Sequence, residues 1–312
     1  MEWWDKLLDK SIYFSFDQSG YQRHAKSFED EELEAKGKTI LITGGTSGIG
    51  LAAVEFFAKT GGSLIILSRD VDKAQQALDG INGADSKKIQ HFQVDLAEPD
   101  SIFSFVKKSD LPQLDTIINN AGGMPQQLTF NSEGIEFIWA SHLLGHYLLT
   151  EILVKNEKLK EGGRVITVSS GGMYPQKLDL SDLNFQKRTY HRYKAYANAK
   201  RAQVILTEKW QENYDNRFTF SVMHPGWVDT SGVEHAMPWF HWWMKRRLRS
   251  PREGADTILW LALTKKDYPG GKLWFDRSIA PKHFFDYTKS SEEEKKQFME
   301  LLLQYKSHSE SM

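Results

Sequence analysis

The sequence predicts an α/β fold in which one doubly wound parallel sheet of seven strands carries helices on both faces. Short β-branched runs alternate with longer helical patterns between Lys38 and Phe275, and this alternation is typical of a parallel sheet covered by helices. A glycine-rich turn follows the first run and opens directly into an apolar helix. Such a turn is typical of the first strand–helix unit of a Rossmann-type sheet.

The runs define the elements in order. We expect strands at residues 39–43, 63–68, 89–94, 115–119, 164–169, 218–223 and 272–275. Apolar residues at helical spacing predict helices at 48–59, 71–78, 99–107, 132–159, 196–214 and 252–263. Residues 1–37 are then an N-terminal extension to a domain at 38–285, with a lid at 231–250. Residues 286–312 form a tail with a charged helix at 290–305.

Composition excludes several classes of protein. The 312 residues carry a formal net charge of −1, so no overall basic surface points to nucleic acid. The chain has no cysteine, which excludes disulfides and thiolate chemistry, and no metal site is expected. The N-terminus is acidic where a secretory leader would be basic, and no window approaches the ~20 apolar residues that span a bilayer. We therefore expect a cytoplasmic protein without a transmembrane segment.

The glycine-rich turn reads TGGTSGIG over residues 43–50. Its glycines let the backbone approach a pyrophosphate, and the N–H groups and dipole of the following helix attract negative charge. The alternative is a turn that only packs helix on strand, but the strand before and the helix after favour a nucleotide. The expected cofactor-binding residues here are Thr43, Gly44, Thr46, Ser47, Gly48, Ile49 and Gly50.

The end of the second strand indicates which nucleotide binds. Arg69 stands where NAD-binding folds place an acid that bonds the ribose 2′-hydroxyl. A guanidinium can instead grip a 2′-phosphate, with Ser68 and Thr46 adding hydroxyls, so NADP(H) is preferred over NAD(H). The alternative is a solvated arginine beside Asp70.

Two later strand ends complete the predicted nucleotide site. Asp95 and Leu96 follow the third strand, where Asp95 could accept a hydrogen bond from adenine or could cap the next helix. The segment NNAG at 119–122 follows the fourth strand and brings small residues beside the adenosine ribose. Its expected site residues are Asn119, Asn120, Ala121 and Gly122.

Five ordered segments resemble the short-chain dehydrogenase/reductase family over about residues 38–275. They are TGGTSGIG at 43–50, NNAG at 119–122, the Ser169–Ser170 pair, YANAK at 196–200 and HPGWVDT at 224–230. The long loop between Ser170 and Tyr196 resembles the retinol-dehydrogenase-like branch, and the segments at 169–173, 224–238 and 248–263 resemble one subgroup of it. The resemblance implies an oxidoreductase that acts on CH–OH and C=O groups.

The resemblance also implies the catalytic roles. Tyr196 would be the general acid/base, Lys200 its partner and Ser170 the residue that polarises the substrate oxygen, with Ser169 in reserve. A free tyrosine has a pKa near 10, and a cation four residues away on the same helix face would favour its phenolate. Tyr190 and Lys194 show the same spacing, but bulky neighbours crowd them, so we favour Tyr196.

One position departs from the family. Members of this type usually have asparagine where this chain has His142, and that asparagine supports a water-linked proton relay to the lysine. A neutral imidazole could donate or accept in its place, or it could simply pack in the helix, so the relay is either rebuilt or weakened. His142 is kept as a candidate catalytic residue on even terms.

The turn after the sixth strand completes the expected site. By resemblance its backbone and the hydroxyl of Thr230 meet the nicotinamide carboxamide, with Pro225, Gly226 and Val228 as the other site residues. The lid that follows is aromatic and then basic, which suggests a small lipophilic alcohol, aldehyde or ketone of retinoid, steroid or fatty type. Its basic end could meet anionic headgroups, or the lid could only close the core.

Three further questions stay open in the sequence. An apolar stripe from Trp3 to Phe16 could anchor the chain peripherally at a membrane or pack on the domain. Because of the substitution at His142, a second hypothesis is a catalytically weak NADP-binding sensor or scaffold. A third is an isomerase or a dehydratase, since the same fold also supports these enzymes. Family members commonly associate through the helices around the catalytic tyrosine, so a homo-oligomer is expected.

Overall fold

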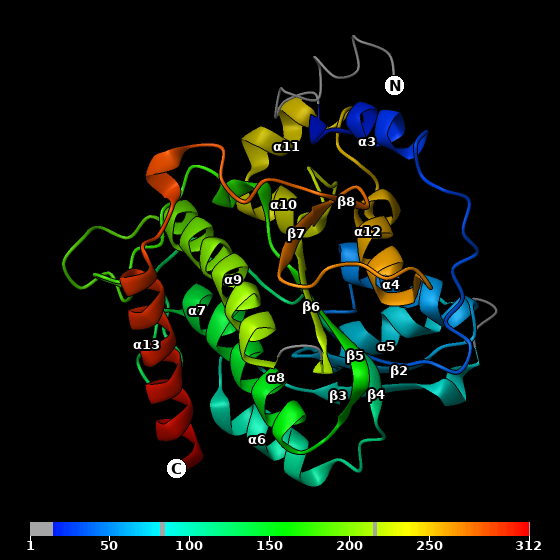
Figure 1. Cartoon of the computed structure of the whole chain (residues 1–312), viewed down its shortest axis with the longest axis horizontal. Helices are drawn as coiled ribbons and strands as arrows, with labels where there is room; N and C mark the ends of the chain where they lie inside the picture. Colours follow the sequence, from blue (N-terminus) through cyan, green and yellow to red (C-terminus); the bar gives the residue numbers. More distant parts are fainter. Residues whose placement is uncertain (1–14, 82–84, 215–216, 312) are drawn as a thin grey trace.

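The computed structural model describes residues 15–81, 85–214 and 217–311, and its centre is one sheet of eight strands (Figure 1). The strands lie in the order β3-β2-β1-β4-β5-β6-β7-β8, of which the first seven are parallel. Their bounds are β1 Thr39–Thr43, β2 Ser63–Ser68, β3 Ile89–Gln93, β4 Leu114–Asn119, β5 Leu159–Val168, β6 Thr219–Met223, β7 Lys272–Phe275 and β8 Ser278–Ile279. The predicted doubly wound α/β fold is confirmed.

The strand count of seven is wrong by one. A two-residue strand, β8, runs antiparallel to β7. The turn between them places Asp276 and Arg277 at positive φ, 47° and 58°, a conformation usually signalled by Gly or Asn. Neither residue marks a turn in the sequence, and two residues are too few for a visible strand pattern.

Helices cover both faces of the sheet because alternate strand residues point to opposite sides. Ile40 and Ile42 share a core with α4 and α12, whereas Leu41 shares a core with α6, α8 and α9. The bounds are α4 Gly48–Lys59, α5 Val71–Asp79, α6 Pro99–Lys108, α8 Gly145–Lys155, α9 Arg192–Tyr214 and α12 Pro251–Leu263. Short 3-10 turns stand at η1 Ser86–Lys88, η3 Gly171–Met173 and η5 Asp286–Thr288.

The helix expected at 132–159 is broken into three parts. It begins only at α7 (Phe137–Trp139), passes through a π-helical turn η2 (Ala140–Leu144) and continues as α8. Glu136 caps α7 by accepting from the Trp139 N–H at 2.8 Å, and Gly134 at φ +73° turns the chain before it. The residues after Lys155 belong to a turn and to β5. Single π turns often stand at functional sites, and His142 lies inside this one.

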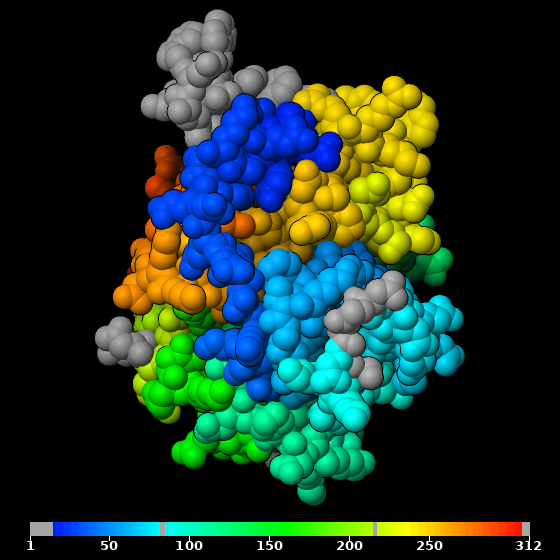
Figure 2. Space-filling model, turned by 90° about the vertical axis from the view of Figure 1, so that its right-hand side faces the viewer, coloured from blue at the N-terminus to red at the C-terminus, as the bar shows by residue number. Residues whose placement is uncertain are grey.

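The N-terminal extension runs along the body of the molecule. Figure 2 shows residues 15–37 in blue lying across the gold and light-blue surface of the domain. Its helix α3 (Gln18–Ala25) begins at the cap Asp17, and Ala35 is fully buried in the core beside α4. The apolar stripe predicted upstream of Phe16 lies outside the described residues.

The tail helix α13 (Glu292–Ser311) covers the outer side of the α7–α9 layer. Phe298 and Leu302 are fully buried, and the Phe298 ring lies 6.4 Å from that of Trp139 on α7. Lys306 donates to Glu151 on α8 at 2.8 Å. The tail is therefore docked on the domain.

One stretch of the described chain, Phe137–Lys155, is long and apolar enough by composition to cross a membrane. This differs from the expectation that no window would approach that length. Its apolar window is 94% buried inside the protein, so the apolar character belongs to the core layer beneath α13.

Candidate active site

Two adjoining cavities lie at the carboxyl ends of β1, β4, β5 and β6. They measure about 310 and 460 Å³ and share the glycine turn after β1 and the small residues after β4. In doubly wound sheets, ligands bind where the strand order reverses, here between β1 and β4. Most of the predicted site residues line this trough: Gly44, Thr46, Ser47, Gly48, Ile49, Gly50, Ser68, Arg69, Asp95, Leu96, Asn120, Ala121, Gly122, His142, Ser170, Tyr196, Lys200, Pro225, Gly226, Val228 and Thr230.

The glycine turn is shaped to let another group approach the backbone. Gly44 and Gly48 have φ of +69° and +54°, and a Cβ at Gly50 would lie 2.2 Å from the Gly44 carbonyl. Ser47 caps α4 without a side-chain hydrogen bond, so the first N–H groups of α4 keep no side-chain partner at the cap. An open helix N-terminus beside a cavity fits a pyrophosphate.

The cavity of about 460 Å³ is lined by two basic side chains, Arg69 and Lys73. Arg69 is more than half exposed, 3.9 Å from Asp95, and stands over the Phe137 ring. Lys73 lines the same cavity, and the sequence interpretation missed it. Asp70 caps α5 by accepting from the Lys73 N–H at 2.9 Å, while Glu98, and not Asp95, stands at the cap of α6.

Two predicted nucleotide contacts, Thr43 and Asn119, do not line either cavity. Both are fully buried, with the Thr43 hydroxyl accepting from the Asn120 and Ala121 N–H groups at 3.0 Å each. The Asn119 amide donates to Thr150 on α8 at 3.1 Å. Side chains alternate along a strand, so a motif residue can point into the core. Thr43 and Asn119 therefore support the turns through hydrogen bonds inside the core and do not line the cavities.

Ser170, Tyr196 and Lys200 all line the cavity of about 310 Å³ at one end of the trough. Ser170 stands two residues after the end of β5 and Tyr196 lies in the second turn of α9, and both line the same cavity. The Lys200 ammonium lies 5.5 Å from the centre of the Tyr196 ring and donates to the Val168 carbonyl at 2.8 Å. The Ser169 hydroxyl instead donates to the Lys200 carbonyl at 2.9 Å. Ser169 thus holds α9 in place, and Ser170 is the serine whose hydroxyl is available to a substrate.

Burial controls the protonation of the pair. It lowers the pKa of Lys200 to about 7. It also raises the pKa of Tyr196 above its usual value, an effect that the neighbouring Ser170 hydroxyl partly offsets. This differs from the expectation that Lys200 would lower the tyrosine pKa. Burial disfavours the Lys200 ammonium and the Tyr196 phenolate when either is charged alone. When both are charged at once, their attraction offsets part of the desolvation penalty of each.

His142 lies against both Tyr196 and Gly122. Its ring stands edge-on to the tyrosine ring at 5.5 Å, and a Cβ at Gly122 would lie 2.3 Å from its Cε1. Nε2 donates to the Gly123 carbonyl at 2.8 Å, which leaves Nδ1 as a buried acceptor without a partner in the structure. Burial, aided by Lys200, holds the pKa of His142 well below its usual value, so the ring is neutral.

The backbone carbonyl of His142 is already bonded twice. It accepts from Gln203 Nε2 at 2.7 Å and from His146 Nδ1 at 3.0 Å. His146 in turn accepts from Thr43 at 3.0 Å. A relay through His142 would therefore use the ring acceptor Nδ1, because its carbonyl is occupied.

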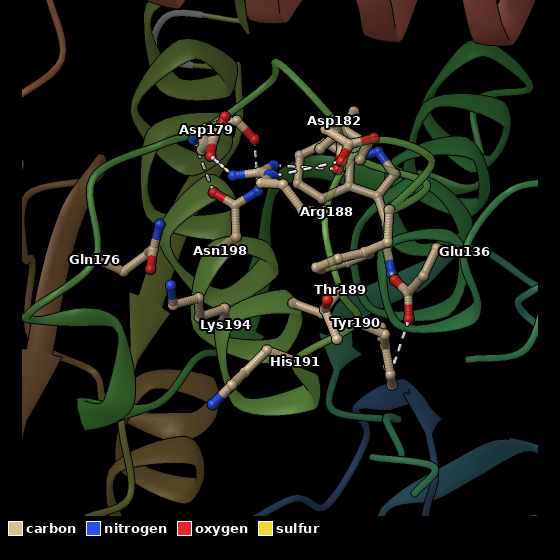
Figure 3. Close-up of a pocket in the computed structure, with 14 residues that line it drawn as sticks. Glu136, Gln176, Asp179, Asp182, Arg188, Thr189, Tyr190, His191, Lys194 and Asn198 are labelled. Carbon is tan, nitrogen blue, oxygen red and sulfur yellow. Dashed lines mark hydrogen bonds and ion pairs between the residues drawn. The ribbon is translucent and has the colours of Figure 1, made fainter. Parts of the chain in front are cut away.

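The alternative pair, Tyr190 and Lys194, lies in a separate cavity of about 330 Å³ (Figure 3). The Tyr190 hydroxyl donates to the buried carboxylate of Glu136 at 3.4 Å, and burial together with Glu136 raises its pKa to about 12. Arg188 holds this loop together by bonding Asp179 and Asp182. Tyr190 thus belongs to the long loop before α9 and Lys194 to the first turn of α9, and their cavity does not include Ser170.

The lid consists of α10 (Ser231–Ala236) and α11 (Pro238–Met244). Thr230 caps α10 by accepting from the Val233 N–H at 3.2 Å. The Phe240 ring meets that of Trp227 at 5.4 Å, and the cavity beneath the lid is bounded mainly by apolar side chains. These are Met124, Trp227, Val233, Ala236, Met237 and Phe240.

Among the residues that the structure describes, no group of three or more His, Asp or Glu side chains is arranged to hold a metal ion.

Comparison with known proteins gives concordant results. The family described as short chain dehydrogenase matches residues 38–239. Dehydrogenase/reductase SDR family member 12 from Homo sapiens is 40% identical over 289 residues, covering 90% of this chain and 91% of that protein. Retinol dehydrogenase 12 from Homo sapiens is 33% identical over 255 residues, covering 78% and 79%. The subgroup resemblance of segments 224–238 and 248–263, which was to family member 12, is confirmed.

Solved structures agree with the fold. That of an uncharacterised protein from Mycobacterium paratuberculosis superposes with a TM-score of 0.64 at 27% identity, covering 78% of this chain and 82% of that one.

Proposed function

Because the chain belongs to the short-chain dehydrogenase/reductase family of oxidoreductases, we propose that it transfers a hydride between NADP(H) and a lipophilic alcohol, aldehyde or ketone. The observation that supports this proposal is that Ser170, Tyr196 and Lys200 line one end of a trough whose middle is lined by the open N-terminus of α4. A dinucleotide supplies the hydride donor or acceptor in such a site.

The chain's own groups handle the proton. In the reducing direction, the Ser170 and Tyr196 hydroxyls donate to the carbonyl oxygen, and Tyr196 transfers its proton as charge develops there. The Lys200 ammonium, on the adjacent turn of α9, stabilises the phenolate that remains. His142 Nδ1 lies buried beside Tyr196 and can accept a hydrogen bond from a water that returns the proton. Each step reverses in the oxidising direction.

NADP(H) is preferred because Arg69 and Lys73 both line the adenosine end of the trough. A guanidinium and an ammonium complement a 2′-phosphate, whereas a ribose diol would call for an acid. Asp70 is occupied in capping α5, which supports the assignment of Arg69. We accordingly expect Arg69→Ala to weaken NADPH binding much more than NADH binding.

The lid favours a lipophilic substrate and a membrane-facing position. The inner side of α11 closes an apolar cavity, while Trp239 and Trp242 on its outer side are 76% and 73% exposed. Exposed Lys245 and Arg246 follow them. Tryptophan and basic side chains suit the interface of an anionic bilayer, so we propose a cytoplasmic protein that touches a membrane peripherally. The absence of cysteine in the sequence fits a reducing compartment.

The experiment is consumption of NADPH and of NADH with retinoid, steroid and medium-chain carbonyls, comparing wild type with Tyr196→Phe. Loss of a positioned proton donor typically costs 10²–10⁴-fold in rate. The matched control, Tyr190→Phe, removes the same hydroxyl from the other cavity and is expected to keep the wild-type rate. Tight NADPH binding without turnover of any carbonyl would contradict the oxidoreductase proposal and favour the sensor, which the altered position at His142 motivates.

A further inference from the structure

The N-terminal extension contacts the turn that follows β6. The Trp227 N–H donates to the Phe16 carbonyl at 2.8 Å, and the Gln18 N–H donates to the Arg247 carbonyl at 2.9 Å. Gly226, at φ +75°, has no room for a side chain because a Cβ would lie 2.6 Å from the same Phe16 carbonyl. The backbone of residue 16 thus supports the turn that lines the trough.

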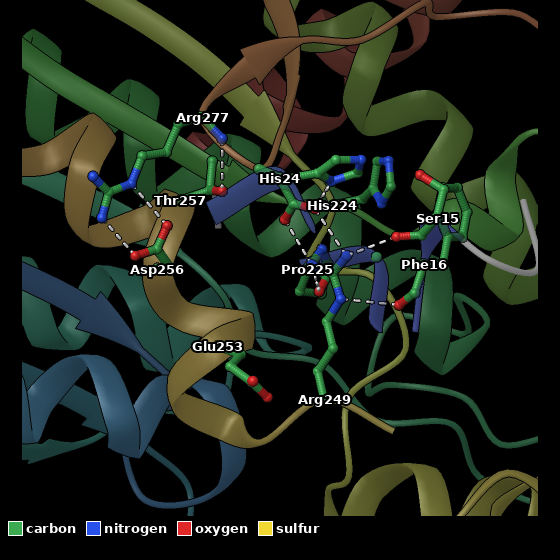
Figure 4. Close-up of polar contacts among 12 residues, drawn as sticks. Ser15, Phe16, His24, His224, Pro225, Arg249, Glu253, Asp256, Thr257 and Arg277 are labelled. Carbon is green, nitrogen blue, oxygen red and sulfur yellow. Dashed lines mark hydrogen bonds and ion pairs between the residues drawn. The ribbon is translucent and has the colours of Figure 1, made fainter. Parts of the chain in front are cut away.

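Arg249 joins the extension, the turn and the end of the sheet (Figure 4). Its guanidinium is fully buried and forms a bidentate ion pair with Asp276 at 2.6 and 2.8 Å. It also donates to the carbonyls of Ser15 at 2.9 Å, Phe16 at 3.0 Å and Pro225 at 3.3 Å. Only a planar fork of donors can serve so many acceptors at once.

Asp276 is held in its charged form within this cluster. Burial alone would raise its pKa, but hydrogen bonds from His24 and Arg249 outweigh burial and lower it. His24 Nδ1 lies 2.6 Å from the Asp276 carboxylate, so α3 is tied to the same point. The buried charges are paired, as they must be at this depth.

The Phe16 side chain also contacts the loop that carries Ser170, on the other side of the cavity from the turn at 225–227. A Cβ at Gly171, the residue after Ser170, would lie 2.5 Å from a Phe16 ring carbon. The same ring meets His224 at 4.6 Å and Trp227 at 5.9 Å. Phe16 therefore packs behind both the Ser170 loop and the turn at 225–227.

We propose that Phe16 and Arg249 are positioning residues that hold the Ser170 loop and the turn at 225–227 at a fixed separation for the nicotinamide ring and the substrate. The N-terminal extension is then a structural part of the active site. This inference rests on the proposed function, since it assigns these two walls to the nicotinamide end. Within the part of the chain that the structure describes, no hydrogen bond, ion pair or cation–π contact of Arg69 or Lys73, at the other end of the trough, reaches this cluster.

The test compares binding of NADPH with binding of 2′,5′-ADP, which carries the phosphates of the adenosine end but no nicotinamide. Full-length Arg249→Lys and Phe16→Ala are expected to weaken NADPH binding about tenfold, or about 1.4 kcal/mol, and to leave 2′,5′-ADP within about twofold. Phe16→Leu, which keeps apolar volume, should recover most of the NADPH affinity. Matched controls are Arg246→Lys and Phe285→Ala, both at exposed side chains.

The outcomes are separable from those for the proposed function. Equal weakening of both ligands, or no change in either by a folded variant, overturns the positioning role even if carbonyls are reduced. A selective loss of NADPH affinity supports it even if no substrate is found. If Arg249→Lys does not fold, the comparison of Phe16→Ala with Phe16→Leu decides the question.

Discussion

At the scale of single residues, the site depends on groups whose charges are costly. Lys200 is buried, with its ammonium bonded to one carbonyl and facing a tyrosine ring. His142 is buried and neutral beside it. Burying such groups destabilises the folded protein. It also brings their pKa values closer together, which helps a proton to move between them.

The cost of Lys200 depends on pH. Its pKa is about 7 in the folded protein, against about 10.4 in an unfolded chain. Below pH 7 lysine is protonated in both states, and the buried ammonium lowers the free energy of unfolding by its full amount. Between pH 7 and the pKa of the unfolded lysine, only the unfolded chain binds the proton, so this destabilisation decreases as pH rises. We expect Lys200→Met to raise Tm relative to wild type more at pH 6 than at pH 9, by about 3 °C.

Calorimetry at the two pH values measures this difference. Lys194→Met, at an exposed lysine on the same helix, should change Tm equally at both. An equal effect of Lys200→Met at pH 6 and pH 9 would contradict a buried lysine with a lowered pKa.

Gly122 and His142 are expected to be energetically coupled. An added Cβ at Gly122 would lie 2.3 Å from the imidazole, so Gly122→Ala should destabilise the protein by about 1–3 kcal/mol. The shorter side chain of His142→Asn should relieve part of that cost in the double variant. Urea unfolding of the four proteins gives the coupling energy.

The neighbouring residue provides the control. A Cβ at Gly123 would come no nearer than 3.9 Å to the Phe137 ring, so Gly123→Ala should cost much less. Additive effects of Gly122→Ala and His142→Asn would show that the ring does not press on Gly122.

Sequence reasoning located the motifs but not the direction of every side chain. The glycine turn, the Ser170 position and the YANAK helix follow from residue type and spacing. Thr43 and Asn119 sit in the same motifs but point into the core, and only the strand pleat decides this. The sequence placed Phe16 in an apolar stripe and Arg249 in the basic end of the lid, but it did not place either at the active site, because their contacts join segments more than 230 residues apart.

At the scale of elements, the strands were predictable because turns of glycine and polar residues bound them closely. The π turn at 140–144 was not, since it depends on how α7 and α8 pack against α9. The 3.6-residue pattern continues through it, so sequence periodicity predicted one long helix. The break matters because it places His142 against Tyr196.

The lid helix α11 predicts a membrane interaction that can be measured. The double variant Trp239→Ala, Trp242→Ala should bind vesicles of phosphatidylcholine and phosphatidylserine about tenfold more weakly than wild type, because exposed indoles insert at the interface. Each of Lys245→Gln and Arg246→Gln should weaken binding by about 1 kcal/mol. Co-sedimentation gives the affinities.

The control replaces aromatic residues of similar exposure elsewhere. Phe285→Ala, Tyr287→Ala removes two exposed rings near η5 and should leave vesicle binding unchanged. Binding of wild type that is equal on vesicles of phosphatidylcholine alone would contradict a role for the basic residues. No binding at all would assign the tryptophans to a protein partner.

At the scale of the whole molecule, α13 decides which surface remains available for association. The resemblance predicted homo-oligomers through the helices around Tyr196, and that stays a prediction. In the structure, however, α13 lies over α7 to α9 through Phe298 and Leu302. Copies that associate through this face would have to displace the tail.

We therefore expect a variant lacking residues 290–312 to form larger assemblies than the full chain of 35.9 kDa, because the variant exposes the apolar surface around Trp139. Light scattering after size-exclusion chromatography measures both masses. The variant Leu303→Ala, at an exposed position of α13, should behave as wild type. A dimer of the full chain would show that copies associate by another face or with α13 displaced.

The docking of the extension also sets an order of events in folding. The carbonyls of Ser15 and Phe16 bind Arg249, which is made more than 230 residues later. Contacts across more than 230 residues close a very long loop, and such non-local contacts form late because their ordering entropy must be overcome first. The sheet can assemble from neighbouring strands beforehand. Competence for the reaction would thus be acquired in a last step, after the fold itself is complete.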